Sequence, residues 1–344
     1  MNHRAAEIPA QFYALVDEIP RIGFKHHASS LISLVANNDP FVEKSIKDVP
    51  LPRGAKAKSA LIISAGPSVR RKESIPRIHR VNYQGTIVAT DGSYIACLKA
   101  GLIPDYVVTL DPHPMRMVRW FGDPDFENNA ESDDYFARQD LDMEFRNNNI
   151  IHNRENIKLV DRYAPLTKLI VATSISESLR RRLSEAKFDM YWWNPLVDNP
   201  RQADSLTRRM YEMNRLPCMN TGGTVGSASW VFVATRLKMP MVGLVGMDFG
   251  YYEDTPLEKT QTYYELVHRL GSEERLENYF ISTVFPLTGE KFYSDPTYFW
   301  YRQNFIELLN NAPSTKTFNC TEGGTLTEGP FKLAFLEDFL AQVR

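Results

Sequence analysis

Short apolar runs that alternate with helical patterns constrain this chain more than any other feature of its sequence. The first three runs are Ala60–Ser64, Thr86–Thr90 and Tyr106–Leu110, which are rich in β-branched residues and do not alternate with polar ones. Such runs are typical of strands that are covered on both faces, as in a parallel sheet. Their alternation with helical patterns predicts an α/β fold with a Rossmann-like, doubly wound, mostly parallel sheet.

The same pattern continues to residue 250 and then loosens. Further strands are predicted at Lys168–Thr173, Met190–Trp193 and Met241–Met247, and helices at Tyr94–Lys99, Ser176–Lys187 and from about Gly223. Beyond Asp248 we expect one helix in residues 251–270, another in 294–311, a short strand in 315–320 and a last helix in 331–343.

These patterns divide the chain of 344 residues into three parts. Residues 1–55 form a helical lead-in, in which Ile8, Phe12, Leu15, Val16 and Ile19 recur at helical spacing and Leu31–Val35 indicates a second short helix. Residues 56–250 form the nucleotide-binding domain, with an acidic insertion at about 121–145. Residues 251–344 form a helical cap over the carboxyl edge of the sheet.

Charge and cysteine content exclude several classes of protein. The formal net charge is −2, so nothing in it indicates nucleic acid as the main partner. The three cysteines lie far apart, which indicates neither a disulfide framework nor a zinc site. No apolar run reaches the roughly 18 residues of a membrane span, and we expect a cytoplasmic protein. The sequence leaves the oligomeric state open.

The turn after the first strand is a candidate phosphate cradle. It reads Ser64-Ala65-Gly66-Pro67-Ser68, in which the glycine permits close approach of the backbone and the serines offer hydroxyl groups. It matches neither the Walker A pattern nor G-x-G-x-x-G. A tight strand-to-helix turn is the alternative interpretation. On the first interpretation Ser64, Gly66 and Ser68 bind the nucleotide.

Carboxylates follow the next two strands. Asp91 and Ser93 come after the second strand and Asp111 after the third, so they are predicted at one edge of the sheet. There they would contact the nucleoside, or Asp91 and Asp111 would hold Mg²⁺ if the reaction depends on it. The alternative is that each aspartate caps a helix or forms an Asx turn.

A second candidate cradle and further reactive side chains come later in the chain. Thr221, Gly222 and Gly223 precede a helix and would bind phosphate, although the glycines could instead serve helix packing. Asp248, Tyr251 and Tyr252 follow the next strand and would face the phosphates or the acceptor, the alternative for the tyrosines being core packing. Asp111, Asp248 and the two tyrosines are the catalytic candidates.

Taken in order, these loops resemble a known family. SAGPSV at 64–69, DGS at 91–93, the stretch 101–112, the block 220–251 and NCTEGGTL at 319–326 resemble the MptE-like family, formerly a domain of unknown function, which includes motility accessory factors that glycosylate flagellin. The resemblance covers roughly residues 58–328. The GPS turn and the block 220–251 are also similar to bacterial sialyltransferases that use CMP-sialic acid.

The resemblance implies two activities. The archaeal members are 6-hydroxymethyl-dihydropterin diphosphokinases that use ATP and Mg²⁺, whereas motility accessory factors are assigned the transfer of nonulosonic acids from CMP-linked donors. The diphosphokinases carry a doubled aspartate, T-D-L-D-G, where this chain has Thr109-Leu110-Asp111-Pro112. In the sialyltransferases, asparagines match Asp91 and Asp111, and this chain has no clean match to their catalytic histidine.

Three hypotheses follow from the residues and the resemblance together. The first is transfer of a nonulosonic, sialic-acid-like sugar from a CMP donor to an acceptor that is a protein, a glycan or a small molecule. The second is Mg²⁺-dependent transfer of diphosphate from ATP to a pterin. The third is a non-catalytic protein that binds a nucleotide.

Overall fold

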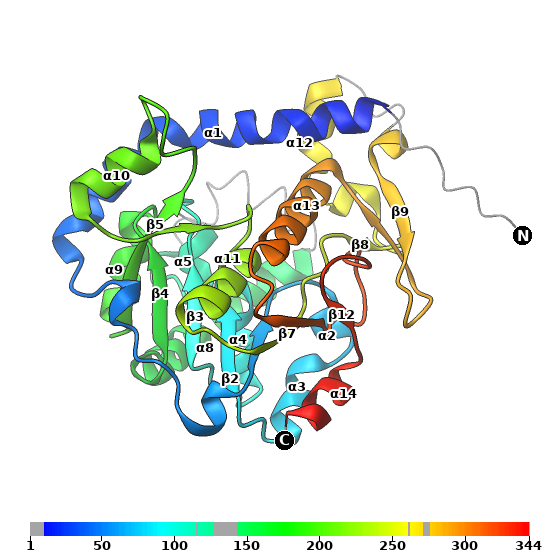
Figure 1. The fold of residues 1–344 in the computed structure, drawn as a ribbon, viewed down its shortest axis with the longest axis horizontal. Coiled ribbons are helices and arrows are strands. Elements are labelled where there is room, and N and C mark those ends of the chain that lie inside the picture. Colours follow the sequence, from blue (N-terminus) through cyan, green and yellow to red (C-terminus); the bar gives the residue numbers. More distant parts are fainter. Residues whose placement is uncertain (1–9, 115, 127–142, 261, 271–275, 344) are drawn as a thin grey trace, which may run out of the picture.

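A nine-stranded parallel sheet lies at the centre of the molecule (Figure 1). The computed structural model describes residues 10–114, 116–126, 143–260, 262–270 and 276–343. The strand order is β12-β11-β7-β1-β2-β3-β4-β5-β6, and each neighbouring pair runs parallel. The predicted α/β fold with a parallel sheet is confirmed.

The strands of this sheet include each run that the sequence predicted as a strand. They are β1 (Ala60–Ile63), β2 (Thr86–Thr90), β3 (Tyr106–Thr109), β4 (Lys168–Ala172), β5 (Asp189–Leu196), β6 (Cys218–Asn220), β7 (Met241–Val245), β11 (Lys316–Asn319) and β12 (Lys332–Leu333). The strands β6 and β12 were not predicted, because two or three residues are too few to show a period.

Helices cover both faces and the carboxyl edge of the sheet. They are α1 (Ala10–Asn38), α2 (Ser68–Arg71), α3 (Ser74–Arg80), α4 (Asp91–Lys99), α5 (Arg116–Arg119), α8 (Met143–Tyr163), α9 (Glu177–Glu185), α10 (Leu206–Asn214), α11 (Val225–Val231), α12 (Tyr263–Leu270), α13 (Pro296–Asn310) and α14 (Leu336–Gln342). A π-helical turn, Phe232–Arg236, continues α11. Side chains cap several helices, as where Ser176 accepts a hydrogen bond from the Leu179 amide at the start of α9.

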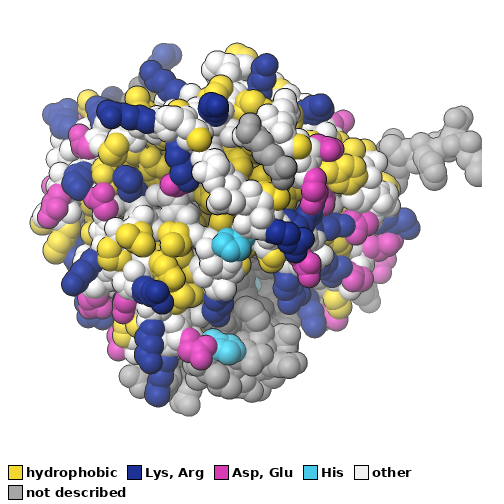
Figure 2. All heavy atoms as spheres, turned by 90° about the horizontal axis from the view of Figure 1, so that it is seen from below, with side chains coloured by type: hydrophobic (Ala, Val, Ile, Leu, Met, Phe, Trp, Pro, Cys, Tyr) yellow, Lys and Arg dark blue, Asp and Glu magenta, His cyan; other side chains and the backbone are white. Residues whose placement is uncertain are grey.

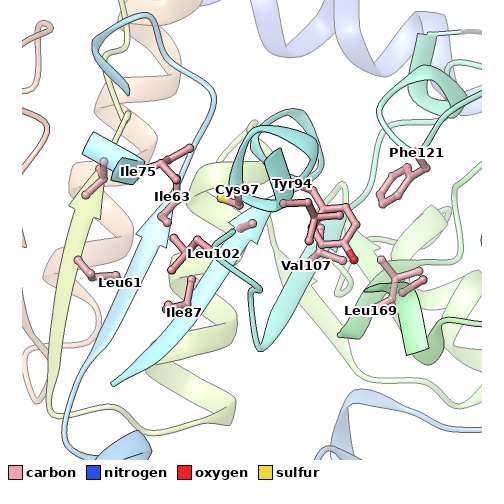
Figure 3. Close-up of a cluster of buried hydrophobic side chains, with 14 of the residues drawn as sticks. Leu61, Ile63, Ile75, Ile87, Tyr94, Cys97, Leu102, Val107, Phe121 and Leu169 are labelled. Atoms are coloured by element: carbon pink, nitrogen blue, oxygen red, sulfur yellow. The ribbon is translucent and has the colours of Figure 1, made fainter. Parts of the chain in front are cut away.

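Alternate side chains of each strand enter two separate cores. From β1, Leu61 and Ile63 pack with α3, α4, α9 and α14 on one face, whereas Ala60 and Ile62 pack with α11 and α13 on the other. Figure 3 shows the first core, in which Tyr94 of α4 is fully buried. Because both faces are buried, the strands are apolar throughout instead of alternating.

One helix replaces the two that we predicted in the lead-in. The 29 residues of α1 lie across the carboxyl edge of the sheet (Figure 1). Near one end Phe12 packs edge-on against Phe299 of α13, with ring centroids 5.2 Å apart, and near the other Val35 lies in a cluster with Met210 of α10. Contacts at both ends stabilise one continuous helix, although the hydrophobic pattern of the sequence indicates two. The predicted position Ile8 lies outside the described residues.

The segment 251–344, predicted as a helical cap, does more than cap the sheet. The expected helices α12 and α13 are present, but β8 (Tyr251–Tyr252), β9 (Ile281–Val284) and β10 (Lys291–Ser294) form an antiparallel sheet that we did not predict. In addition, β11 pairs with β7 and β12 with β11. The reason is that β7 would otherwise leave its backbone groups unpaired at a sheet edge.

Two other expectations concern the surface. The predicted acidic insertion at about 121–145 falls mainly on residues 127–142, which lie outside the described residues, and α8 begins at Met143. Within the described part of the chain, no helix has the length and apolar character that crossing a bilayer requires. On the face opposite α1, basic and acidic side chains both occur, with hydrophobic ones between them (Figure 2).

Candidate functional site

The sheet reverses its strand order between β1 and β7. The chain runs outward from β1 to β6 on one side, and β7 returns on the other side of β1. In open α/β sheets, ligands bind at such a switch point, outside the carboxyl ends of the strands. The turns after the two strands are joined there, because the Ser64 amide donates to the Val245 carbonyl at 2.8 Å and the Gly66 amide to the Gly246 carbonyl at 3.0 Å.

A cavity of about 280 Å³ opens at this point, and we call it the switch-point hollow. Four loops line it, together with two aromatic side chains from elsewhere in the chain. They are the turn Ser64–Pro67, the stretch Thr90–Gly92, the stretch Thr224–Gly226, the stretch Gly246–Gly250, and the side chains of Trp120 and Tyr298. Thus Ser64, Gly66, Asp91 and Asp248, which the sequence singled out, do line one hollow.

Asp248 occupies the position that we predicted for a phosphate. Its carboxylate accepts hydrogen bonds from the Ser68 hydroxyl at 2.7 Å and from the Ser68 amide at 3.2 Å. Burial raises the pKa of Asp248 to about 7, although the bonds from Ser68 favour the charged form. Ser68 is therefore a buried partner of Asp248 and is not among the residues that line the hollow.

The glycine of this turn is required by the same aspartate. A Cβ atom at Gly66 would lie 1.9 Å from Asp248 Oδ2 and 2.5 Å from the Gly246 carbonyl oxygen. Next to it, the Ser64 hydroxyl is buried and has no hydrogen-bond partner among the described residues. Ser64 is thus the serine of this turn whose hydroxyl has no partner among the described residues.

Asp91 and Ser93 have different surroundings. The Asp91 carboxylate lines the hollow and accepts hydrogen bonds from the Thr109 hydroxyl at 2.9 Å and the Gly92 amide at 2.7 Å. The Ser93 hydroxyl donates to the Ile63 carbonyl at 2.6 Å, behind the hollow. Ser93, predicted to bind nucleotide, therefore ties α4 to β1.

A second cavity of about 540 Å³ lies along the same edge, and we call it the large hollow. It is lined by Leu110–Pro112, Leu196–Asp198, Asn220–Gly223 and side chains from α1 and α13. Asp111 lies here, so Asp91 and Asp111, predicted as a Mg²⁺ pair, line different hollows. The described residues contain no cluster of three His, Cys, Asp or Glu that could hold a metal ion.

The loop predicted as a second phosphate cradle uses its amides internally. The Gly222 amide donates to Asn220 Oδ1 at 3.0 Å, and the Gly223 amide to the Thr221 hydroxyl at 3.2 Å. A Cβ atom at Gly223 would lie 2.4 Å from the Tyr301 ring of α13. These glycines therefore serve helix packing, which was the alternative interpretation.

Neither predicted catalytic tyrosine is among the residues that line the two hollows. The Tyr251 hydroxyl donates to Asp295 Oδ2 at 3.1 Å. The Tyr252 ring lies beneath the Arg71 guanidinium, 3.9 Å from its carbon, and burial raises the pKa of the Tyr252 hydroxyl. Both tyrosines pack in the antiparallel sheet, which was again the alternative.

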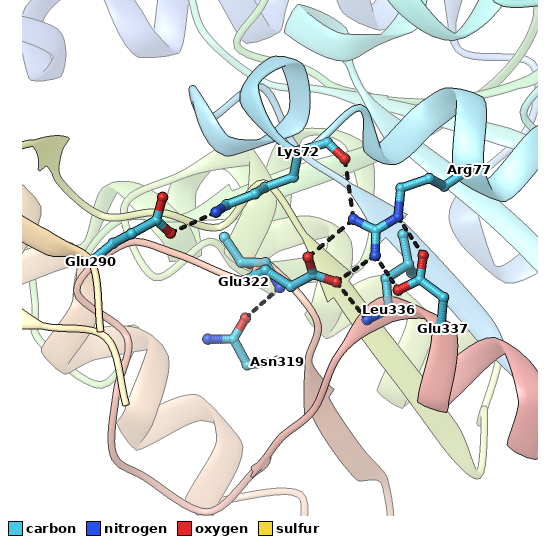
Figure 4. A network of polar contacts seen from close by, with 8 residues as sticks. Lys72, Arg77, Glu290, Asn319, Glu322, Leu336 and Glu337 are labelled. Atoms are coloured by element: carbon cyan, nitrogen blue, oxygen red, sulfur yellow. Dashed lines mark hydrogen bonds and ion pairs between the residues drawn. The ribbon is translucent and has the colours of Figure 1, made fainter. Parts of the chain in front are cut away.

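The loop 319–326 contacts the backbone of Asp248. The Thr325 amide donates to the Asp248 carbonyl at 2.7 Å. Glu322 is held by the Arg77 guanidinium at 2.7 and 3.0 Å and accepts a hydrogen bond from the Leu336 amide at 2.7 Å (Figure 4). This loop therefore holds the backbone of Asp248 in place.

Sequence reasoning missed the side chains that α13 contributes. Tyr298 lines the switch-point hollow, and Trp300, Tyr301 and Asn304 line the large one. The helix itself was predicted, and its aromatic first turns were visible in the sequence. Nothing in the sequence placed it over the carboxyl ends of the strands.

Known proteins resemble this chain in part of its sequence and in its fold. Residues 33–129 match the family model described as 6-hydroxymethylpterin diphosphokinase MptE-like. This segment, which we call the MptE-like segment, contains the predicted motifs at 64–69, 91–93 and 101–112, whereas the blocks 220–251 and 319–326 lie outside the match. The MptE-like segment contains β1, β2 and β3, and therefore the turn Ser64–Ser68, Asp91 and Asp111.

The chain also shares its fold with a solved protein. The structure of MAf glycosyltransferase from Magnetospirillum magneticum AMB-1 matches with a TM-score of 0.56 and 13% sequence identity. The match covers 90% of this chain and 38% of that protein, so the chain spans well under half of its length. No curated protein sequence matches the chain.

Proposed function

We propose that the chain is a glycosyltransferase that transfers a nonulosonic acid from a CMP-linked donor, with the nucleotide in the switch-point hollow. The observation that carries this proposal is the hollow itself, which lies where doubly wound sheets bind nucleotides. The MptE-like segment and the fold shared with MAf glycosyltransferase support the transferase class.

Asp91 and Asp248 both line the switch-point hollow, and the ionisation of Asp248 affects whether an anion can enter. None of the described residues that line the switch-point hollow is Lys, Arg or His, so an ionised Asp248 would repel a phosphate. With a pKa of about 7, Asp248 is protonated in part of the molecules at neutral pH and then donates a hydrogen bond to a phosphate oxygen. The free Ser64 hydroxyl offers a second donor.

These groups fit loss of CMP from the donor. The bond between the anomeric carbon and the phosphate oxygen breaks, and CMP leaves with the electron pair. The acceptor oxygen bonds to the same carbon, and its proton passes through water to the phosphate of the departing CMP. Donors aimed at the phosphate stabilise the charge that develops on the leaving group.

Two tryptophans make the proposal testable. The chain has five, of which Trp192, Trp193 and Trp230 are at most 1% exposed, whereas Trp120 lines the switch-point hollow and Trp300 the large one. In the variant Trp300→Phe, CMP and CDP should change the fluorescence of Trp120 in the presence of EDTA, and more strongly at pH 6 than at pH 8.

The controls separate binding from disturbance of the fold. Trp120→Phe should abolish the response, and Ser64→Ala should weaken binding of CMP about tenfold, as loss of a buried hydrogen bond predicts. No response to a cytidine nucleotide at either pH would refute the proposal.

Diphosphate transfer from ATP to a pterin is the second candidate, because the matching family model carries that description. Such a reaction requires Mg²⁺ to neutralise the phosphates. A Trp120 response to ATP alone, and only when Mg²⁺ is added, would select this candidate over glycosyl transfer.

A further inference from the structure

The large hollow is roughly twice the size of the switch-point hollow and, like it, contains no Lys, Arg or His among the described residues that line it. The loop Asn220–Gly226 separates the two hollows and contributes to both walls. A molecule in the large hollow would therefore lie beside one in the switch-point hollow.

Three carboxylates of the described residues line the large hollow, and two of them, Asp111 and Asp198, are engaged within the protein. Asp198 accepts hydrogen bonds from the Ser205 hydroxyl and the Leu206 amide, both at 2.6 Å, and these contacts lower its pKa. Asp111 Oδ1 accepts the His113 amide at 2.8 Å. A cationic ligand would gain little from Asp111 and Asp198, whose charge is already satisfied at a turn and at a helix start. Glu307, an exposed residue of α13, is a further hydrogen-bond acceptor in this lining.

Two aromatic rings form one wall of the hollow. The centroids of Trp300 and Tyr301 lie 5.4 Å apart at an interplanar angle of 52°. Both rings pack against Gly223, where a Cβ atom would lie 2.4 Å from Tyr301 and 2.9 Å from Trp300. Because the rings are held in place, they offer a preformed apolar surface to the C–H face of a sugar ring.

An amide beside these rings is available for hydrogen bonding. Asn304 follows them on α13, is half-buried, and makes no hydrogen bond with another described residue. Its side chain can both donate and accept, which matches a sugar hydroxyl and is neutral overall.

We infer that the large hollow binds a neutral sugar unit of the acceptor, stacked on Trp300 and hydrogen-bonded to Asn304. This inference rests on the proposed function and narrows its acceptor to a glycan. The shared loop then brings an acceptor hydroxyl next to the donor in the switch-point hollow.

The test uses the second reporter tryptophan. In the variant Trp120→Phe, methyl glycosides of neutral hexoses and N-acetylhexosamines should change the fluorescence of Trp300 and protect it from acrylamide quenching. In the same background Asn304→Leu should weaken binding about tenfold, because one hydrogen-bonding group is lost. Gln303→Leu, at an exposed neighbouring position on α13, is the matched control and should bind as before.

Three results would overturn the inference: no response to any neutral glycoside, a response only to an arginine-containing peptide, or unchanged binding in Asn304→Leu. The two proposals fail separately, since the nucleotide is read at Trp120 and the sugar at Trp300. A response of Trp300 to glycosides without any response of Trp120 to nucleotides would leave a carbohydrate site and refute the CMP donor.

Discussion

At the scale of single residues, Asp248 organises the candidate site. Its carboxylate is held by Ser68 and requires a glycine at position 66. The sequence placed Asp248, Ser68 and Gly66 near one another, but it assigned the serine and the glycine to a phosphate. In the structure a carboxylate of the chain takes that place, and burial raises its pKa to about 7.

This arrangement predicts a pH dependence of stability. The pKa of Asp248 rises from 3.8 to about 7 on folding, so the folded protein holds the proton more tightly in this range. The stabilisation is complete below about pH 4 and is lost as the pH rises to about 7, at about 1.4 kcal/mol per pH unit.

In Asp248→Asn, Oδ1 can still accept from the Ser68 amide and Nδ2 can donate to the Ser68 hydroxyl, while the titration is removed. Urea unfolding from pH 4 to pH 8 should show the free energy of unfolding of the wild type falling relative to that of the variant by up to about 4 kcal/mol. If the free energies of unfolding of the two proteins vary with pH in parallel, folding does not raise the pKa of Asp248.

At the scale of elements, three separate parts of the chain meet at Arg77. The side chain extends from α3 and pairs with Glu322 of the loop 319–326 and with Glu337 of α14 (Figure 4). Burial of Glu322, which is 6% exposed, makes this pairing necessary. The network therefore fixes the loop that supports Asp248.

Loss of the Arg77 guanidinium should destabilise the folded protein. Arg77→Met leaves Glu322 buried without its guanidinium and should lower the free energy of unfolding by about 2–4 kcal/mol. Lys44→Ala, which breaks an exposed pair with Asp189, is the control and should have no measurable effect. Equal results from urea unfolding of the two variants would mean that the buried network does not stabilise the fold.

At the scale of the whole molecule, the carboxyl-terminal part completes the sheet. The strand β11 covers the edge of β7, and α14 buries Leu336 and Phe339 against the first core. Helices α1 and α13 close the carboxyl edge above the two hollows. The last 30 residues are thus part of the central α/β fold.

A truncated chain tests this view. A chain that ends at residue 313 loses β11, β12 and α14, exposes a strand edge and opens one core, so it should be unfolded or aggregated. Circular dichroism and size-exclusion chromatography measure this outcome. A chain that ends at Gln342 is the control and should fold as the full chain does, whereas a folded product ending at residue 313 would show that this segment is a removable cap.

The sequence by itself determined the fold class and the edge of the sheet where the site lies. Strands such as β1 and β2 are continuously apolar because both faces are buried, and turns such as Ser64–Ser68 must follow their carboxyl ends. Both signals depend on residues close together in the chain, so periodicity alone reveals them.

Only the tertiary structure decided which polar groups are free. Ser64 and Asn304 remain available, whereas Ser68, Ser93 and the loop Asn220–Gly223 satisfy their hydrogen bonds within the protein. Their partners lie up to 180 residues away, as Asp248 does from Ser68. A local pattern shows which residue types stand at a turn, but the long-range packing of α13 and of the loop after β7 decides which of them face a ligand.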